Sequence, residues 1–169
     1  RWCWGMLGTR HRQFGNIIGH VDGVSDMGSL VEWTAQQFDP ALSWRDVEWI
    51  KERWGGPLIV KGILDAEDAR LAVDSGADAI IVSNHGGRQL DGAPSAISAL
   101  PPIVDAVGGR VEVHMDGGIR SGQDVLKAIA LGARGVYIGR AMMYGLGACG
   151  EAGVSEVLRI IRNELDLSM

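Results

Sequence analysis

The sequence is poor in the residues that build disulfide frameworks and metal centres. It holds 2 cysteines, Cys3 and Cys149, and 4 histidines, and they follow no metal-ligand spacing. Disulfide scaffolds and zinc sites need several such residues at short, defined intervals. We therefore expect free thiols, a reducing compartment and no metal site.

Long apolar runs and an excess of positive charge are also missing. No stretch approaches the roughly 18–20 apolar residues of a membrane-spanning helix, and no secretory signal peptide is recognisable. The 21 Asp and Glu residues outnumber the 16 Lys and Arg residues, which gives a formal net charge of −5. An acidic chain argues against a nucleic-acid partner. The length of 169 residues and a hydrophobic content of 46% suit about one globular domain.

Residues 1–40 lack sustained hydrophobic periodicity, so we expect a long loop with at most short helical pieces. Trp2 and Trp4 lie close to the basic residues Arg10 and Arg12. One interpretation is a segment, residues 1–20, that contacts a membrane interface. The other is a loop that packs on a neighbouring domain or subunit.

From Ser43 onward the sequence repeats a strand–helix unit four times. Short apolar strands are predicted at residues 57–60, 78–82, 111–115 and 135–138. Helices are predicted to follow capping signals at 43, 65 and 121, to span 94–107 with a bend at Pro101-Pro102, and to span 151–165. Continuous apolar strands alternating with helices indicate a parallel sheet covered by helices. Four units form either a small open sheet or half of an eight-stranded β/α barrel.

The stretch from residue 83 to 92, SNHGGRQLDG, follows one of these buried strands. His85 can move a proton near neutral pH, and Arg88 offers a planar fork for a carboxylate or phosphate. The glycines between them let the backbone turn and approach a ligand. A polar turn is the alternative, but the combination favours proton or hydride chemistry on a small acid.

Two further turns predict a phosphate site. Residues 116–122, DGGIRSG, join a strand to a helix, and Gly139-Arg140 ends the next strand. Glycine turns at helix N-termini bind phosphate, and β/α barrels place such turns after their last two strands. This pairing favours the half-barrel over the open sheet. Two tight turns with a solvated arginine are the alternative. Lys61, at the end of the first strand, points either toward a bound anion or outward to solvent.

Residues 58–63, 83–91, 115–120 and 137–140 together resemble the FMN-dependent 2-hydroxy acid dehydrogenases and oxidases, a family that includes L-lactate dehydrogenase, mandelate dehydrogenase and glycolate oxidase. The resemblance extends over residues 40–169. It implies that His85 is the base that takes a proton from the substrate, and that Arg88 binds the substrate carboxylate. It further implies that Lys61 lies beside flavin N1 and that Ser83 bonds near the flavin. The resemblance also implies that the FMN ribityl chain and phosphate are bound by Asp116, Gly118, Arg120, Gly139 and Arg140.

The resemblance also implies an incomplete barrel, because family members carry four earlier β-α units. We therefore expect residues 41–169 to be the second half, about four β-α units, of a TIM (β/α)8 barrel, as a fragment or a split gene product. The expected activity is FMN-dependent oxidation of a lactate- or mandelate-like L-2-hydroxy acid. Alternatives are a flavin-free, phosphate-binding barrel lyase, isomerase or synthase, and a catalytically incomplete interaction module.

The resemblance leaves the electron acceptor open between a quinone, a cytochrome and oxygen. The expected location is the cytoplasm, either free or peripheral on the inner face of the plasma membrane through residues 1–20. The complete protein is expected to be a homo-oligomer.

Overall fold

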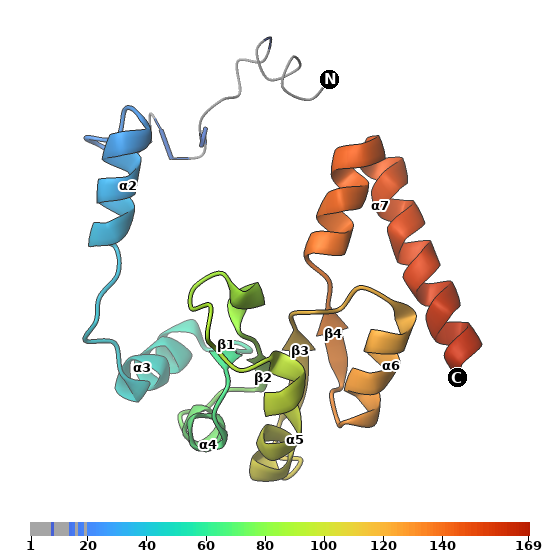
Figure 1. Ribbon diagram of the computed structural model, residues 1–169. Coiled ribbons are helices and arrows are strands. Elements are labelled where there is room, and N and C mark those ends of the chain that lie inside the picture. The colour runs from blue at the N-terminus through green and yellow to red at the C-terminus, as the bar shows by residue number, and fades with distance from the viewer. Residues whose placement is uncertain (1–7, 9–13, 16, 19) are drawn as a thin grey trace. The chain divides into compact units, whose positions relative to one another are not determined.

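The computed structural model describes residues 8, 14, 15, 17, 18 and 20–169 (Figure 1). Contacts divide the chain into an N-terminal unit, residues 1–42, and a sheet unit, residues 43–169. The predicted membrane segment at residues 1–20 lies largely outside the described residues. Among the described residues, no helix has both the length and the apolar character that crossing a membrane requires.

The N-terminal unit contains one helix, α2 (Met27–Gln36), within its described part. Asp26 caps the helix by accepting a hydrogen bond of 2.8 Å from the Ser29 amide, and the Ser29 hydroxyl accepts from the Asp26 amide at 3.1 Å. This reciprocal capping box satisfies two backbone donors that would otherwise be unpaired. This ten-residue helix is a helical piece within the region predicted to be mainly loop, and its start follows from the capping signal of Asp26 and Ser29.

The sheet unit is built on four parallel strands in the order β1-β2-β3-β4. The strands are β1 (Ile59–Ile63), β2 (Ala79–Val82), β3 (Glu112–Asp116) and β4 (Gly135–Tyr137). The helices are α3 (Trp44–Trp54), α4 (Ala66–Asp74), α5 (Ala96–Val107), α6 (Gly122–Ala130) and α7 (Arg140–Ser168), with a short 3₁₀ turn, η1 (His85–Gly87). This alternation confirms the predicted α/β class and a partial β/α barrel.

Helix boundaries follow the capping chemistry of the sequence. Ser43 and Asp46 form a capping box at the start of α3, and Gly55 ends the helix in a left-handed conformation with φ 65°. Only glycine adopts that conformation without a steric penalty from a Cβ. Helix α5 continues through Pro101 and Pro102, so the helix does not restart at these prolines. Proline has a helical φ, and burial of the apolar face of α5 offsets the lost backbone bonds.

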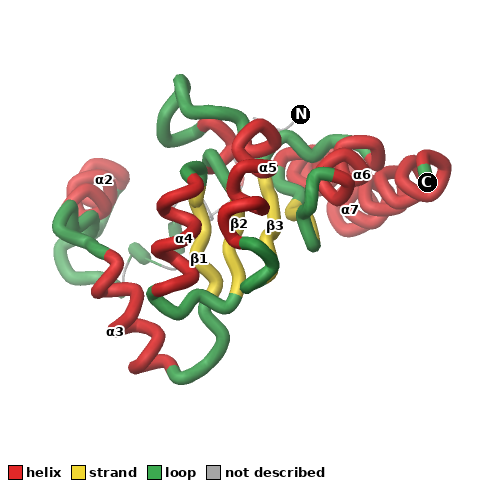
Figure 2. The backbone as a smooth tube through the Cα atoms, turned by 90° about the horizontal axis from the view of Figure 1, so that it is seen from below, coloured by secondary structure: helices red, strands yellow, loops and turns green. Residues whose placement is uncertain are grey.

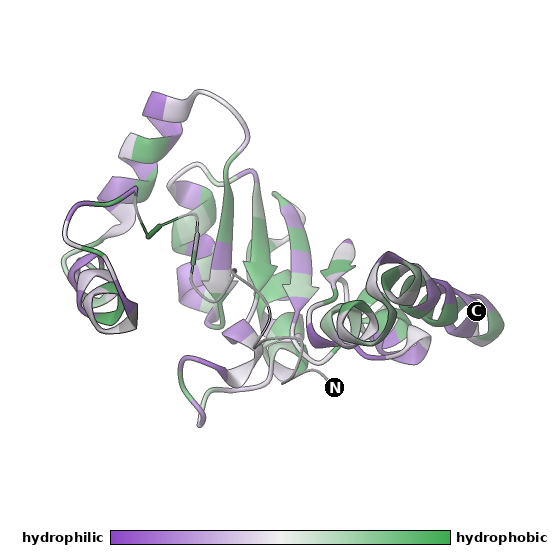
Figure 3. Cartoon of the chain, turned by 90° about the horizontal axis from the view of Figure 1, so that it is seen from above, coloured by the Kyte–Doolittle hydropathy of each residue, from purple (hydrophilic) through white to green (hydrophobic). Residues whose placement is uncertain are grey.

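The core lies between the sheet and helices α4 and α5, which cover one face of the strands (Figure 2). Ile80 and Val82 of β2 face this core and are fully buried, as are Leu100 and Ile103 of α5. Burying a side chain of this size contributes about 1.5–3 kcal/mol. The central strands are accordingly the most hydrophobic part of the sheet unit in Figure 3.

The opposite face of the sheet carries polar side chains, because alternate strand residues point to opposite sides. Lys61 pairs in register with Ile81, and Ile81 pairs with His114. The register shifts between Lys61 and Ile63, so that Ile63 is buried in the core two residues after Lys61. Strand β1 is therefore displaced from the predicted 57–60, and Lys61 lies within the strand instead of ending it.

Helix α7 begins eleven residues earlier than the start predicted near Glu151. It folds into two limbs at Cys149 and Gly150, whose backbone dihedrals are not helical (Figure 1). A Cβ on Gly145 would meet the Gly153 carbonyl, so glycine at this position lets the limbs touch. The first limb thus starts directly after β4, where its N-terminus borders the site.

Candidate active site

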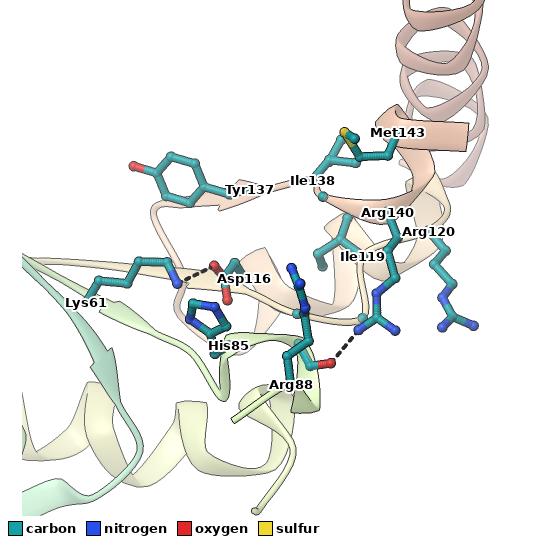
Figure 4. Close-up of a pocket in the computed structure, with 14 residues that line it drawn as sticks. Lys61, His85, Arg88, Asp116, Ile119, Arg120, Tyr137, Ile138, Arg140 and Met143 are labelled. Carbon is teal, nitrogen blue, oxygen red and sulfur yellow. Dashed lines mark hydrogen bonds and ion pairs between the residues drawn. The ribbon is translucent and has the colours of Figure 1, made fainter. Parts of the chain in front are cut away.

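The C-terminal ends of the strands surround an open pocket of about 330 Å³ (Figure 4). Charged residues come to it from β1, η1, β3 and the start of α7, which are far apart in the sequence. Its polar and glycine lining is Lys61, His85, Gly86, Arg88, Asp116, Gly117, Gly118, Arg120, Tyr137, Gly139 and Arg140. Ligand sites of β/α barrels occupy this end of the strands, because the βα loops there are free to vary.

Lys61 is the centre of a small polar network on the pocket floor. Its ammonium lies 3.0 Å from the Asp116 Oδ2 atom and donates a 3.0 Å hydrogen bond to the Ser83 hydroxyl. Ser83 is buried, with 2% of its surface exposed, whereas 44% of the Lys61 side chain is exposed. Asp116 and Ser83 thus fix the position of the Lys61 ammonium, and the exposed part of the side chain faces the pocket.

Asp116 keeps one oxygen for a ligand. Its Oδ2 atom pairs with Lys61, and its Oδ1 atom is buried and has no hydrogen-bond partner within the described part of the chain. Buried carboxylate oxygens are normally satisfied. A hydroxyl donor from a molecule in the pocket would satisfy this one.

His85 sits on η1 beside this network, and Figure 4 shows its ring below Lys61 and Asp116. Its backbone φ is 57°, a left-handed value that is uncommon for residues other than glycine. The Ser83 hydroxyl accepts a 3.1 Å hydrogen bond from the His85 amide. His85 and Arg88 are both exposed at the pocket wall, where a substrate could reach them.

The three arginines of the pocket differ in what they contact. Arg140 donates a hydrogen bond from its guanidinium to the Gly86 carbonyl, which ties the start of α7 to η1. Figure 4 shows that the Arg120 side chain extends on the far side of Arg140, away from Lys61. Arg88 lies on the near side of Arg140, next to His85. One of the three arginines therefore lies beside His85 and two lie toward the glycine turns.

The N-termini of helices α6 and α7 lie near Arg120 and Arg140. Helix α6 is closed by a capping box, in which Asp124 Oδ2 accepts from the Arg120 and Ser121 amides at 3.0 Å each. Burial works against ionisation of Asp124, but these amides and the Ser121 hydroxyl bond to the carboxylate and lower its pKa overall. Helix α7 instead has Gly139 at its N-cap and no side-chain cap among the described residues. Its first amides are available to an anion.

The structure brings together all nine residues predicted for the site. Eight of them line the pocket, and Ser83 lies beneath it on Lys61. Tyr137 and Met143 also line the pocket but were not predicted as site residues: Tyr137 lies in the recognised stretch 137–140 without an assigned role, and Met143 lies outside every recognised motif. His114, which points to the same face as Asp116, is not among the lining residues and lies 3.1 Å from Glu112 Oε2. Among the described residues, no cluster of three metal-ligating side chains is present.

The pocket fits FMN by the chemistry of its groups. A flavin nucleotide presents a phosphate, ribityl hydroxyls and an electron-poor ring. The uncapped N-terminus of α7 and the two arginines beside it suit the phosphate. The unpartnered Asp116 oxygen suits a ribityl hydroxyl, and the Lys61 ammonium suits negative charge on the ring. Gly117 and Gly118, with φ of 89° and 82°, let the backbone come close to the ligand.

Comparisons with known proteins agree with this description. Curated L-lactate dehydrogenases from Caulobacter vibrioides and Pseudomonas syringae are 51% and 53% identical to this chain over 170 and 165 residues. These alignments cover 99% and 98% of the chain but 44% and 43% of the relatives, so the chain spans less than half of their length.

Two solved structures are also similar. A monotopic membrane protein, (S)-mandelate dehydrogenase, matches with a TM-score of 0.87 at 39% identity, over 98% of this chain and 44% of that one. A mandelate oxidase bound to (S)-4-hydroxymandelic acid matches with a TM-score of 0.78 at 51% identity, over 83% and 39%. The sequence model of the FMN-dependent dehydrogenases matches residues 1–169. The chain belongs to the FMN-dependent dehydrogenase family.

Proposed function

We propose that this chain is the C-terminal half of an FMN-dependent L-2-hydroxy acid dehydrogenase that oxidises a lactate- or mandelate-like acid to the 2-oxo acid. The observation that carries the proposal is the convergence of a base, a carboxylate clamp and a cofactor-type cation, His85, Arg88 and Lys61, in one pocket. The relatives named L-lactate dehydrogenase, at about half identity over the whole chain, support the same reaction class.

His85 and Arg88 divide the work on the substrate. Arg88 forms a two-point contact with the substrate carboxylate, which fixes the orientation of the 2-hydroxyl group. His85 accepts the hydroxyl proton, for which imidazole has a suitable affinity near neutral pH. Bound FMN supplies the acceptor for the hydride that leaves the substrate carbon. The exposure of both side chains at the pocket wall is consistent with direct contact to the substrate.

Lys61 and the glycine turns hold the cofactor in this proposal. The ammonium of Lys61 stabilises negative charge on the reduced ring, and Asp116 and Ser83 keep it in place. Asp116 Oδ1 would accept a hydrogen bond from a hydroxyl of the ribityl chain. Gly118, Arg120, Gly139 and Arg140 surround the phosphate at the N-terminus of α7.

The test is to join residues 1–169 to the part of the Caulobacter relative that precedes the matched region. This joined protein should be yellow, with flavin absorbance, and should reduce a dye on addition of lactate, mandelate or glycolate. Comparing oxygen with a quinone as acceptor would separate an oxidase from a dehydrogenase. A colourless protein would instead favour the flavin-free phosphate-binding barrel. A yellow protein inactive on all three acids would leave an interaction module as the better description.

A peripheral membrane contact through residues 1–20 is a second, separable proposal. The tryptophans and arginines of that segment suit a membrane interface, and a solved relative of similar fold is named a monotopic membrane protein. The joined protein should sediment with anionic lipid vesicles, and replacing Trp2 and Trp4 with serine should release it while turnover is retained. Equal sedimentation of both proteins would contradict this. Sizing the same protein would test the expected homo-oligomer.

A further inference from the structure

The backbone that carries His85 is held in an unfavourable conformation. His85 has a φ of 57°, and Asn84 before it lies between the helical and extended regions, with φ −92° and ψ 20°. Sparsely populated conformations of this kind cost about 1–3 kcal/mol each and persist where surrounding contacts enforce them. Relaxation of either residue would turn the imidazole to another direction. The contacts that prevent relaxation therefore decide where the base points.

Three side chains supply these contacts at Gly86 and His85. The Ser83 hydroxyl accepts from the His85 amide, and the Arg140 guanidinium donates to the Gly86 carbonyl. The third is Asn84, whose Oδ1 atom accepts a 3.0 Å hydrogen bond from the Gly86 amide. Ser83 also bonds Lys61, and Arg140 belongs to the turn proposed for the phosphate. Asn84 is the member of this set to which the proposed function assigns no role.

Asn84 also reaches beyond its own loop. Its Nδ2 atom donates a 3.2 Å hydrogen bond to the Pro94 carbonyl, just before α5. A Cβ on Gly117 would lie 3.1 Å from its Oδ1 atom, so the amide is packed against the turn that follows β3. One half-buried side chain thus connects the His85 loop, the start of α5 and the turn after Asp116.

The chemistry of these contacts requires an asparagine. The Gly86 amide needs an acceptor and the Pro94 carbonyl needs a donor, and a short side-chain amide offers both. Aspartate would keep the acceptor but would place a carboxylate against the Pro94 carbonyl. Serine is too short to span both partners, and alanine provides neither group.

We propose that Asn84 is a positioning residue, whose side-chain amide holds the His85 backbone so that the imidazole points into the pocket. The inference rests on the proposed function, in which His85 is the base. It predicts that loss of the amide lowers kcat and leaves KM and flavin binding unchanged, because the hydrogen bonds of the Asn84 side chain go to Gly86 and Pro94, and its contact with the turn after Asp116 is packing against Gly117 alone. A misplacement of about 1 Å at a reacting group costs about 10²-fold in rate.

The experiment compares Asn84→Ala and Asn84→Asp in the joined protein, with Ser98→Ala as the control. Ser98 makes a hydrogen bond of similar length, 2.8 Å from its hydroxyl to the Ser95 carbonyl, at the start of the same helix. We expect Asn84→Ala to lower kcat by about 10- to 100-fold, with unchanged flavin content and KM and with faster hydrogen exchange in the segment around Gly86. Ser98→Ala should match the wild type in kcat and in exchange of that segment.

Asn84→Asp keeps the acceptor for the Gly86 amide and adds a negative charge near His85. A neighbouring carboxylate raises the pKa of an imidazole. The rising limb of kcat/KM against pH should therefore move to higher pH. Exchange around Gly86 should increase less than in Asn84→Ala, because the acceptor for the Gly86 amide is kept and the donor to the Pro94 carbonyl is lost. This variant decides the question if Asn84→Ala fails to fold.

The outcomes separate this inference from the proposed function. Unchanged kcat in Asn84→Ala would overturn the positioning role, whether or not exchange increases. An unshifted pH profile in a folded Asn84→Asp would also count against it. A wild-type protein without hydroxy acid turnover would defeat the proposed function, whereas the exchange measurement would still show whether Asn84 holds the loop.

Discussion

Two lysine–aspartate pairs lie at opposite ends of the parallel strands and differ in what surrounds them. At the C-terminal end, Lys61 lies 3.0 Å from Asp116, and Asp116 leaves a buried oxygen without a partner among the described residues. At the N-terminal end, Lys51 lies 2.5 Å from Asp78, and the same Asp78 oxygen accepts from the Leu58 amide at 2.6 Å.

In the pair at the N-terminal end, both charged groups make further hydrogen bonds to the protein backbone. Lys51 also donates to the Gly56 carbonyl, and the Asp78 amide donates to the Leu58 carbonyl, so each charged group has partners within the fold. The pair at the C-terminal end leaves Asp116 Oδ1 without a hydrogen-bond partner among the described residues, and a bound ligand would supply one. The difference teaches that one end of this sheet is built for stability and the other for binding, although both use the same two residue types.

The largest effect should come from His85, the proposed base at the C-terminal end of the strands. Replacing it with alanine in the joined protein should lower kcat by about 10²–10⁴-fold, because general-base catalysis contributes that much. Flavin absorbance and the melting temperature should stay close to wild type, since the exposed imidazole is not part of the core. Steady-state kinetics with lactate and a flavin spectrum are the measurements. Undiminished turnover would remove His85 from its role.

The two lysines provide a matched pair of substitutions. Lys61→Met should lower kcat by about 10²–10³-fold, the usual cost of losing a group that stabilises developing charge, with little change in melting temperature. Lys51→Met should lower the melting temperature and leave kcat unchanged. Kinetics and thermal unfolding of both variants test the comparison. Activity loss in Lys51→Met without destabilisation would contradict the division between the two ends.

Gly118 and Gly132 form a second matched pair, with positive φ values of 82° and 102°. Within the described part of the chain, a Cβ on Gly118 meets nothing within 4 Å, whereas one on Gly132 would lie 2.8 Å from Val104 Cγ1. Gly132→Ala should therefore destabilise the fold by about 1–3 kcal/mol through overpacking. Gly118→Ala should cost less stability and weaken FMN affinity instead. Urea unfolding and flavin fluorescence titration measure the two effects, and equal destabilisation would contradict the contrast.

The smallest expected effect is on the pH dependence of stability and involves Asp78 of the Lys51–Asp78 pair. The hydrogen bond from the Lys51 ammonium, together with that from the Leu58 amide, lowers the pKa of Asp78 below its usual value of 3.8. A carboxyl with a lowered pKa in the folded state stabilises the fold above 3.8, and this contribution is lost as pH falls through the folded pKa. Asp78→Asn should melt a few degrees lower than wild type at neutral pH, and the gap should close in acid. A gap that is the same at both pH values would show that ionisation of Asp78 is not involved.

Much of the sheet unit could be predicted because its signals are local. The capping boxes at Ser43 and Ser121 and the buried run of β2 lie within a few residues of the elements they define. The first limb of α7 was missed because its start depends on β4 ending at Tyr137, two residues before the N-cap Gly139, and its glycines, such as Gly145, signal loops when read alone. Helix α5 was predicted over 94–107 from its apolar face, but that it continues without a break through Pro101 and Pro102 depends on burial of this face, which offsets the two lost hydrogen bonds.

The sequence by itself determined which groups the site contains. His85, Arg88, Lys61 and the glycine turns are chemically distinctive, and each follows an apolar run of residues that can be recognised without coordinates. Only the tertiary structure decided how they combine. It brought the Ser83 hydroxyl into hydrogen-bond contact with Lys61 and left the buried Asp116 Oδ1 atom without a partner among the described residues. It also placed Asn84 in contact with three separate segments. Those relations join residues from different strands, and their distances depend on sheet register and on the shift at Gly62, which no local pattern encodes.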